Sequence, residues 1–158
     1  DAVPGVDVSA ADCPRFVDFV EQGQIHASTT AEPNVSIGIA SGDVVSIAQA
    51  DDVMQGAPNF GLVSKGSWAE ENSANVNKIQ DALIEANKLL NSDPELARNM
   101  VDSYMDLDED VLELLHLPHF AEKPFEPEEI KPVSDRLVEF KLIKEDEVPD
   151  PADVIFTN

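Results

Sequence analysis

Apolar residues recur along much of the chain at the three- and four-residue steps that are typical of amphipathic helices. The clearest such helix is expected from about 72 to 90, with one apolar stripe made of Val76, Ile79, Leu83, Ala86 and Leu90. A second helix is expected over about 94–105, because Asp93 is a good N-cap and Pro94 suits the first helical position. Its pattern predicts a buried face made of Ala97, Met100, Val101 and Tyr104.

Three further helices are predicted with weaker patterns. One covers 9–22, with Ser9 as N-cap and Gly23 as its stop. A short one follows the acidic turn 108–110, where carboxylates suit the positive end of a helix dipole, and buries Val111, Leu112 and Leu115. After an extended connector over 117–127, a last helix is expected between Pro127 and Phe140.

Short runs rich in β-branched residues predict strands between the helices. They cover 25–30, 44–48 and 60–64, and the last two are expected to be neighbours in a sheet. The run 35–40 is small and apolar, and its pattern fits a helix or an irregular crossover equally well.

The charge narrows the possible partners. The 158 residues suffice for one domain, and 32 acidic against 10 basic residues give a net charge of -22. Nucleic acid and anionic membranes need a basic surface, so neither is expected as a partner. The acidity fits a high-salt habitat, where repulsion is screened, and fits an ordinary acidic protein equally well. No run of apolar residues reaches the ~20 residues of a membrane span, so no membrane insertion is expected.

Residues suited to chemistry are few. Cys13 is the single cysteine, so no internal disulfide is possible, and neither a Gly-x-Ser-x-Gly nor a phosphate-binding glycine motif occurs. His116 and His119 have a metal-ligand spacing, but Pro118 between them favours a solvated loop. The acidic residues 106–110 lack the glycine of a calcium loop and are better explained as a helix start. The prediction is therefore a protein without catalytic residues, metal or cofactor.

One ordered set of motifs resembles the periplasmic solute-binding proteins of ABC importers, the family that serves nitrate, sulfonates, taurine and thiamine-precursor pyrimidines. A helix that ends in glycine and a short strand, FVDFVEQGQIHA at 16–27, precede an acid-proline corner at Glu32-Pro33. Downstream come PNFGLV at 58–63, the long helix, NSDPELA at 91–97 and a closing segment VEFKLI at 138–143. The chain departs from the family at His26, where an acid is usual, and in lacking an aromatic residue at the corner.

The resemblance implies an α/β fold of the type II periplasmic-binding-protein kind, in its C-terminal half. Residues 1–33 would end the second lobe up to the crossover, and 34–158 would form the C-terminal part of the first lobe with a helical tail. The crossover would place the ligand-binding residues in the cleft between the lobes, namely Ser28, Thr29, Thr30, Glu32 and Asn34. Since a carboxylate repels anions, Glu32 favours an amino-bearing or zwitterionic solute. The alternative is a purely structural role, in which these residues only cap local turns.

The function expected from the resemblance is capture of a small polar solute for an importer, without catalysis. Its partners would be the solute, an ABC permease and a separate N-terminal chain or lobe, in the periplasm or outside the cell, with tethering through an upstream segment left open. The alternative is a non-transport interaction subunit that docks on another protein through an acidic face. A third possibility, an enzyme of the same fold, would need a pocket bearing a cysteine or a histidine.

Overall fold

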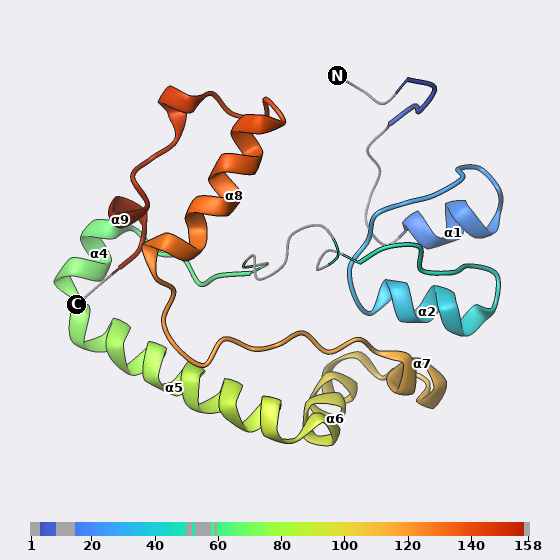
Figure 1. The fold of residues 1–158 in the computed structure, drawn as a ribbon. Coiled ribbons are helices and arrows are strands. Elements are labelled where there is room, and N and C mark those ends of the chain that lie inside the picture. Colours follow the sequence, from blue (N-terminus) through green and yellow to red (C-terminus); the bar gives the residue numbers. More distant parts are fainter. Residues whose placement is uncertain (1–3, 9–14, 50–51, 53–57, 59, 157–158) are drawn as a thin grey trace. The chain divides into compact units, whose positions relative to one another are not determined.

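The computed structural model describes residues 4–8, 15–49, 52, 58 and 60–156, and helices make up more than half of them (Figure 1). Their order is α1 (Phe16–Glu21), α2 (Asn34–Ser41), α4 (Gly66–Glu71), α5 (Ser73–Ser92), α6 (Pro94–Met105), α7 (Glu109–Leu114), α8 (Pro127–Glu139), a 3-10 turn (Glu145–Glu147) and α9 (Pro151–Val154). The chain divides into two compact units. The first unit combines Asp1–Ile47 with Pro94–Pro118, and the second combines Ala48–Asp93 with His119–Asn158.

The expected α/β fold is wrong, because the described residues contain no strand and no sheet. The runs 25–30, 44–48 and 60–64 are extended or irregular, without ladder partners. Their apolar side chains are largely exposed, Ile47 at 81% and Val63 at 89%. A β-branched run favours extended dihedral angles, but a strand also needs a neighbour that accepts and donates its backbone hydrogen bonds. These runs are rich in β-branched residues, but they lack a neighbouring strand in the described part of the chain.

The first unit is built around close contacts of α2 with α1 and α7. Gly38 of α2 lies where a Cβ atom would come within 2.7 Å of a Val17 methyl carbon and 2.6 Å of a Val44 methyl carbon. Ala97 of α6, Val111 of α7 and Leu115 are buried apolar residues of this unit. The predicted domain boundary at residue 33 lies inside this unit.

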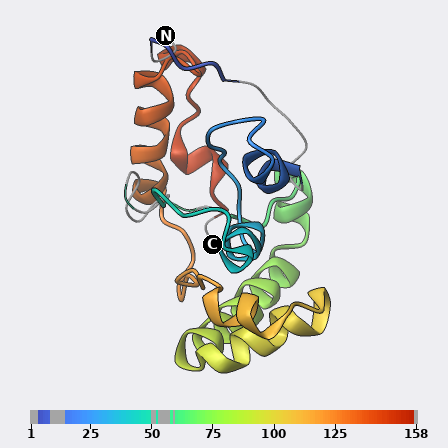
Figure 2. The same ribbon diagram turned by 90° about the vertical axis from the view of Figure 1, so that its right-hand side faces the viewer.

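The second unit contains α4, α5, α8 and α9. Contacts join α4 to α5 and α8 to α9, and Figure 2 shows the chain after α8 returning along that helix. Of its described apolar side chains, Ala69 of α4 is the buried one. Asn87 and Asn91, one turn apart on α5, hold the extended segment that starts at His119. Asn91 accepts from the Phe120 N–H (3.0 Å) and donates to the Phe120 carbonyl (2.8 Å), and Asn87 donates to the Ala121 carbonyl (2.6 Å).

Most helix predictions are confirmed. The long helix is α5, the one after Asp93 is α6, the short acidic one is α7, and the last is α8. The undecided run 35–40 is helical, within α2. The predicted helix 9–22 appears as α1, while its proposed N-cap Ser9 and the cysteine Cys13 lie outside the described residues.

The predicted burial of two helices is only partly confirmed. Ala97 of α6 is buried and Val101 half-buried, but Met100 is 44% exposed and Tyr104 is 83% exposed. On α5, Ile79 and Leu83 of the predicted stripe are 41% and 46% exposed. An amphipathic pattern predicts which face suits burial, but it does not supply the element that covers that face.

Candidate functional site

The five predicted ligand-binding residues lie on the segment that leads into α2. Ser28 and Thr29 are exposed, Thr30 and Glu32 are half-buried, and Asn34 is the first residue of the helix. The segment lies within the first unit, where α2 packs on α7. The structure thus brings them to one helix start, and their role in solute binding stays a prediction.

Glu32 uses both carboxylate oxygens on backbone groups. Its Oε2 accepts from the Ser36 N–H (3.1 Å), in the first turn of α2. Its Oε1 accepts from the His116 N–H (3.2 Å), just after α7. The N-cap residue of α2 is Pro33, whose side chain has no acceptor, so the carboxylate of Glu32 fills that place and adds a negative charge at the helix start. The geometry gives Glu32 a structural task, which agrees with the turn-capping alternative.

Two hydroxyl groups near the start of α2 lack a hydrogen-bond partner within the described residues. Ser36 is 1% exposed, and both its Oγ and the Oγ1 of Thr30 are buried without a partner. A buried hydroxyl without a partner costs about 1–3 kcal/mol. Among the described residues, neither hydroxyl therefore contributes a hydrogen bond to the packing around the start of α2.

Arg98 acts at the C-terminal end of α7, close in sequence to the His116 N–H that donates to Glu32. Its Nε donates to the Leu112 carbonyl (3.0 Å), Nη2 to the Leu115 carbonyl (3.4 Å) and Nη1 to the Pro94 carbonyl (3.4 Å). The last carbonyls of a helix have no partner inside the helix, so a guanidinium there satisfies them and suits the negative end of the dipole. Every guanidinium nitrogen of Arg98 is thus engaged with backbone oxygens.

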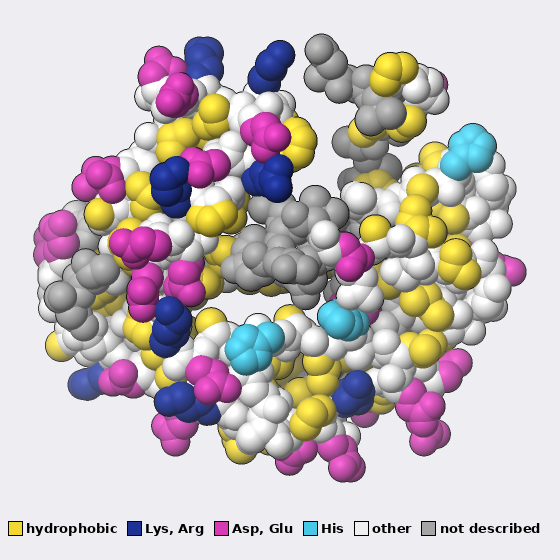
Figure 3. All heavy atoms as spheres, in the orientation of Figure 1, with side chains coloured by type: hydrophobic (Ala, Val, Ile, Leu, Met, Phe, Trp, Pro, Cys, Tyr) yellow, Lys and Arg dark blue, Asp and Glu magenta, His cyan; other side chains and the backbone are white. Residues whose placement is uncertain are grey.

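An exposed surface that we call the acidic face lies on α6, on α7 and on the turn 106–108 between them. It consists of the apolar side chains Met100 and Tyr104 and of the exposed carboxylates Glu95, Asp106, Asp108, Glu109, Asp110 and Glu113. Figure 3 shows acidic side chains gathered over these two helices. Arg98 is the single lysine or arginine between 94 and 118, against seven Asp and Glu residues, so its charge offsets only a small part of theirs. The acidic face is therefore strongly negative.

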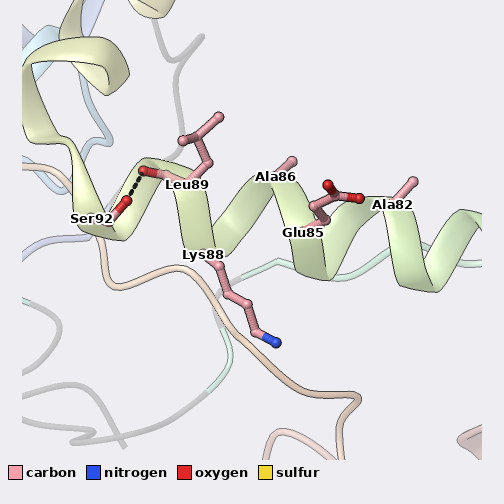
Figure 4. Close-up of a pocket in the computed structure, with 6 residues that line it drawn as sticks. All are labelled: Ala82, Glu85, Ala86, Lys88, Leu89 and Ser92. Atoms are coloured by element: carbon pink, nitrogen blue, oxygen red, sulfur yellow. Dashed lines mark hydrogen bonds between the residues drawn. The ribbon is translucent and has the colours of Figure 1, made fainter.

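A second exposed apolar strip, the α5 strip, runs along α5 and consists of Ile79, Ala82, Leu83, Ala86 and Leu89. A shallow hollow of about 540 Å³ lies along it, and its lining residues Ala82, Glu85, Ala86, Lys88, Leu89 and Ser92 all belong to this one helix. In Figure 4 Ala82, Ala86 and Leu89 lie along one side of α5, while Lys88 points the other way. Ligand pockets enclose most of a small molecule between several elements, whereas a hollow lined by one helix is a flat surface.

The remaining candidates for chemistry stay apart. Among the described residues no group of three or more His, Cys, Asp and Glu side chains could hold a metal ion. The acidic residues 108–110 form the start of α7, with Asp108 as N-cap, as the helix-start interpretation predicts. Trp68 lies on α4 and is 44% exposed.

None of the described helices combines the length and the apolar character that a membrane span requires.

No protein-family model, curated protein or solved structure matches the chain. The class to which the described structure belongs is therefore given by its own architecture, two small helical units with exposed apolar helix faces.

The sequence led to an acidic docking face as an alternative function, but its pattern assigned Met100 and Tyr104 to a buried face and did not predict the exposure of α5. The signal was present in the sequence, because Asp106, Asp108 and Asp110 come within six residues after Tyr104. Any surface that covers this apolar pair must also come close to these carboxylates. Acidity next to an apolar stripe is the feature that could have indicated an external partner.

Proposed function

We propose that this chain is a non-catalytic interaction subunit, whose helical faces are covered by another protein. The observation that carries the proposal is the exposure of side chains that the sequence pattern assigns to a core, on α5 and α6. Monomeric proteins rarely leave contiguous apolar patches open, and such patches commonly mark protein interfaces. Solute capture for an importer remains a separate, untested hypothesis, and without the expected sheet it has lost its structural basis.

The composition of the exposed surfaces supports a protein partner. Methionine and aromatic residues are enriched at protein interfaces, and the buried centres of interfaces are more apolar than their rims. The acidic face has Met100 and Tyr104, and the α5 strip has Ile79, Leu83 and Leu89. The hollow on α5 is open and lined by one helix, which suits a flat macromolecular contact better than a small molecule.

The proposal is tested in the cells that make the protein. Epitope-tagged chain should elute from a sizing column, in cleared extract, in a complex larger than the monomer. A variant with Ile79→Ser, Leu83→Ser, Met100→Ser and Tyr104→Ser should elute as the monomer, since both exposed surfaces are altered.

A matched control places serine at exposed polar positions of the same helices, Lys78→Ser and Asn99→Ser, and should stay in the complex. Circular dichroism of both purified variants should match the unsubstituted chain, because all substituted side chains are exposed. Elution of the unsubstituted chain as a monomer in its own cells would overturn the proposal.

A further inference from the structure

We propose that the acidic face binds a basic amphipathic helix of another protein. This helix packs on the ridge of α6, the row of side chains that contains Met100 and Tyr104, and places its cationic side chains against the carboxylates. This inference rests on the proposed function and adds the chemistry of the partner. It commits to one surface, the acidic face in the first unit, and to one kind of occupant.

The ridge has the geometry of a helix-packing surface. Met100 and Tyr104 are four residues apart, so they lie on the same side of α6, one turn above the other. Leu96, half-buried, continues the same row by another turn. Eight residues of helix span about 12 Å, and rows of side chains at four-residue steps are the ridges that pack into the grooves of a second helix.

The carboxylates are close enough to this ridge to select the charge of what binds there. Asp106 and Asp108 follow Tyr104 by two and four residues, so they lie within about 7 Å and 14 Å along the chain. Electrostatic interactions extend over about 10 Å at 0.1 M salt and about 30 Å at 0.01 M salt. A cationic side chain beside the ridge would therefore be attracted, and an anionic one repelled.

Charge also disfavours a second copy of the chain as the occupant of the same apolar surface. A second copy would bring a net charge of -22 against a face that is itself acidic. A basic helix is the partner that meets both the apolar and the electrostatic demand, as in helix-in-groove recognition.

The experiment uses the full chain and a fluorescein-labelled peptide of about 18 residues, built from Lys and Leu with the leucines at three- and four-residue steps. Fluorescence anisotropy should show saturable binding that weakens at least about tenfold between roughly 0.05 M and roughly 0.5 M salt, as expected for a charged contact. Two control peptides separate the contributions: one replaces every Lys by Glu, and one keeps the composition but scrambles the order so that no apolar face forms. Both should bind at least about tenfold more weakly.

Chain variants locate the contact. Met100→Ser with Tyr104→Ser should weaken binding of the Lys-Leu peptide about tenfold or more, because hot-spot side chains dominate such interfaces. Asp106→Asn with Asp108→Asn should weaken it severalfold and flatten its salt dependence. Leu62→Ser with Val63→Ser, exposed apolar residues that belong to neither the acidic face nor the α5 strip, should leave the affinity unchanged. All these side chains are exposed, and circular dichroism checks that each variant keeps its helices.

Equal binding of the scrambled peptide would reduce the interaction to net charge and overturn the inference. An unchanged affinity for the Met100→Ser, Tyr104→Ser variant would overturn it as well. These failures differ from failure of the proposed function: a chain that elutes in a large complex from its own cells, yet does not select the Lys-Leu peptide, is an interaction subunit with a different kind of partner.

Discussion

The two units of the chain differ in what their charged side chains connect: distant backbone segments in the first unit, and residues within six positions of each other in the ion pairs of the second. In the first unit Glu32 and Arg98 form hydrogen bonds with backbone groups, at the start of α2 and at the C-terminal end of α7. In the second unit the ion pairs are between exposed side chains, such as Lys131–Asp135 (2.7 Å) and Arg136–Glu139 (2.8 Å). Exposed pairs contribute about 0–1 kcal/mol each, whereas a charged group that satisfies buried or half-buried backbone contributes more.

The buried residues of the two units indicate which unit is the more stable without a partner. The first unit has a small core, whose buried residues include Ser36 and Gly38 of α2 and the apolar side chains Ala97, Val111 and Leu115. In the second unit α5 has no buried residue, although it is 20 residues long. We therefore expect the first unit to be the more stable on its own and the second unit to depend more on what covers α5. The following substitutions test this comparison, from the largest expected effect to the smallest.

Glu32→Ala should destabilise the first unit by about 3 kcal/mol, because it leaves the backbone N–H groups of Ser36 and His116 without their charged acceptor. Hydrogen exchange should rise in α2 and α7, and the second unit should keep its protection. The control is Glu85→Ala on α5, an exposed glutamate that should change stability by less than about 0.5 kcal/mol. Equal exchange in α2 before and after Glu32→Ala would contradict the structural task of this carboxylate.

Gly38→Ala should destabilise the first unit, because the new methyl group would overlap the side chains of Val17 and Val44, at a cost of about 1–3 kcal/mol. The gain of about 1 kcal/mol that alanine usually brings to a helix offsets part of that cost and leaves a net loss of up to about 2 kcal/mol. Urea unfolding measures it, and Gly66→Ala on α4 is the control, since a Cβ atom there meets open space. A Gly38→Ala variant as stable as the Gly66→Ala variant would show that α2 is packed less closely than we describe.

Asn91→Ala should destabilise the second unit by about 1–2 kcal/mol and free the segment that starts at His119, because the amide exchanges two hydrogen bonds with Phe120. Amide exchange of Phe120 provides the measurement. Asn91→Asp keeps an acceptor for the Phe120 N–H but loses the donor to its carbonyl, so it should restore the protection of Phe120 only in part. Protection of Phe120 that survives Asn91→Ala would mean that α5 does not hold this segment.

Acidification should loosen the start of α8 by a small amount. The Glu126 backbone N–H, which donates to the carboxylate of Glu129, lowers the pKa of Glu129 below its ordinary value of 4.5, with a smaller contribution from Lys123. Because the folded pKa lies below the unfolded one, this stabilisation is complete above pH 4.5 and is lost as the pH falls through the lower, folded pKa. Carboxyl NMR titration should show the depressed pKa, and Glu129→Gln should remove this acid-dependent change at the Glu126 amide.

The sequence by itself determined most of the helices. α5, α6 and α7 begin and end close to the predicted positions, because their apolar periods and the signals Asp93-Pro94 and 108–110 act within one or two turns of chain. The candidate surfaces were visible in the same pattern, as apolar stripes next to acidic residues. What the sequence could not provide was the identity of the surface that each stripe meets.

Tertiary structure decided the rest. Extended runs such as 44–48 and 60–64 become strands only when a second segment pairs with them, and that pairing joins residues far apart in the chain. The roles of Glu32 and Arg98 are likewise decided by distance in space: a carboxylate at 32 meets the backbone of His116, and a guanidinium at 98 meets the carbonyl of Leu115. Local patterns fix local dihedral angles, whereas pairing, capping across helices and exposure depend on which segments fold against each other.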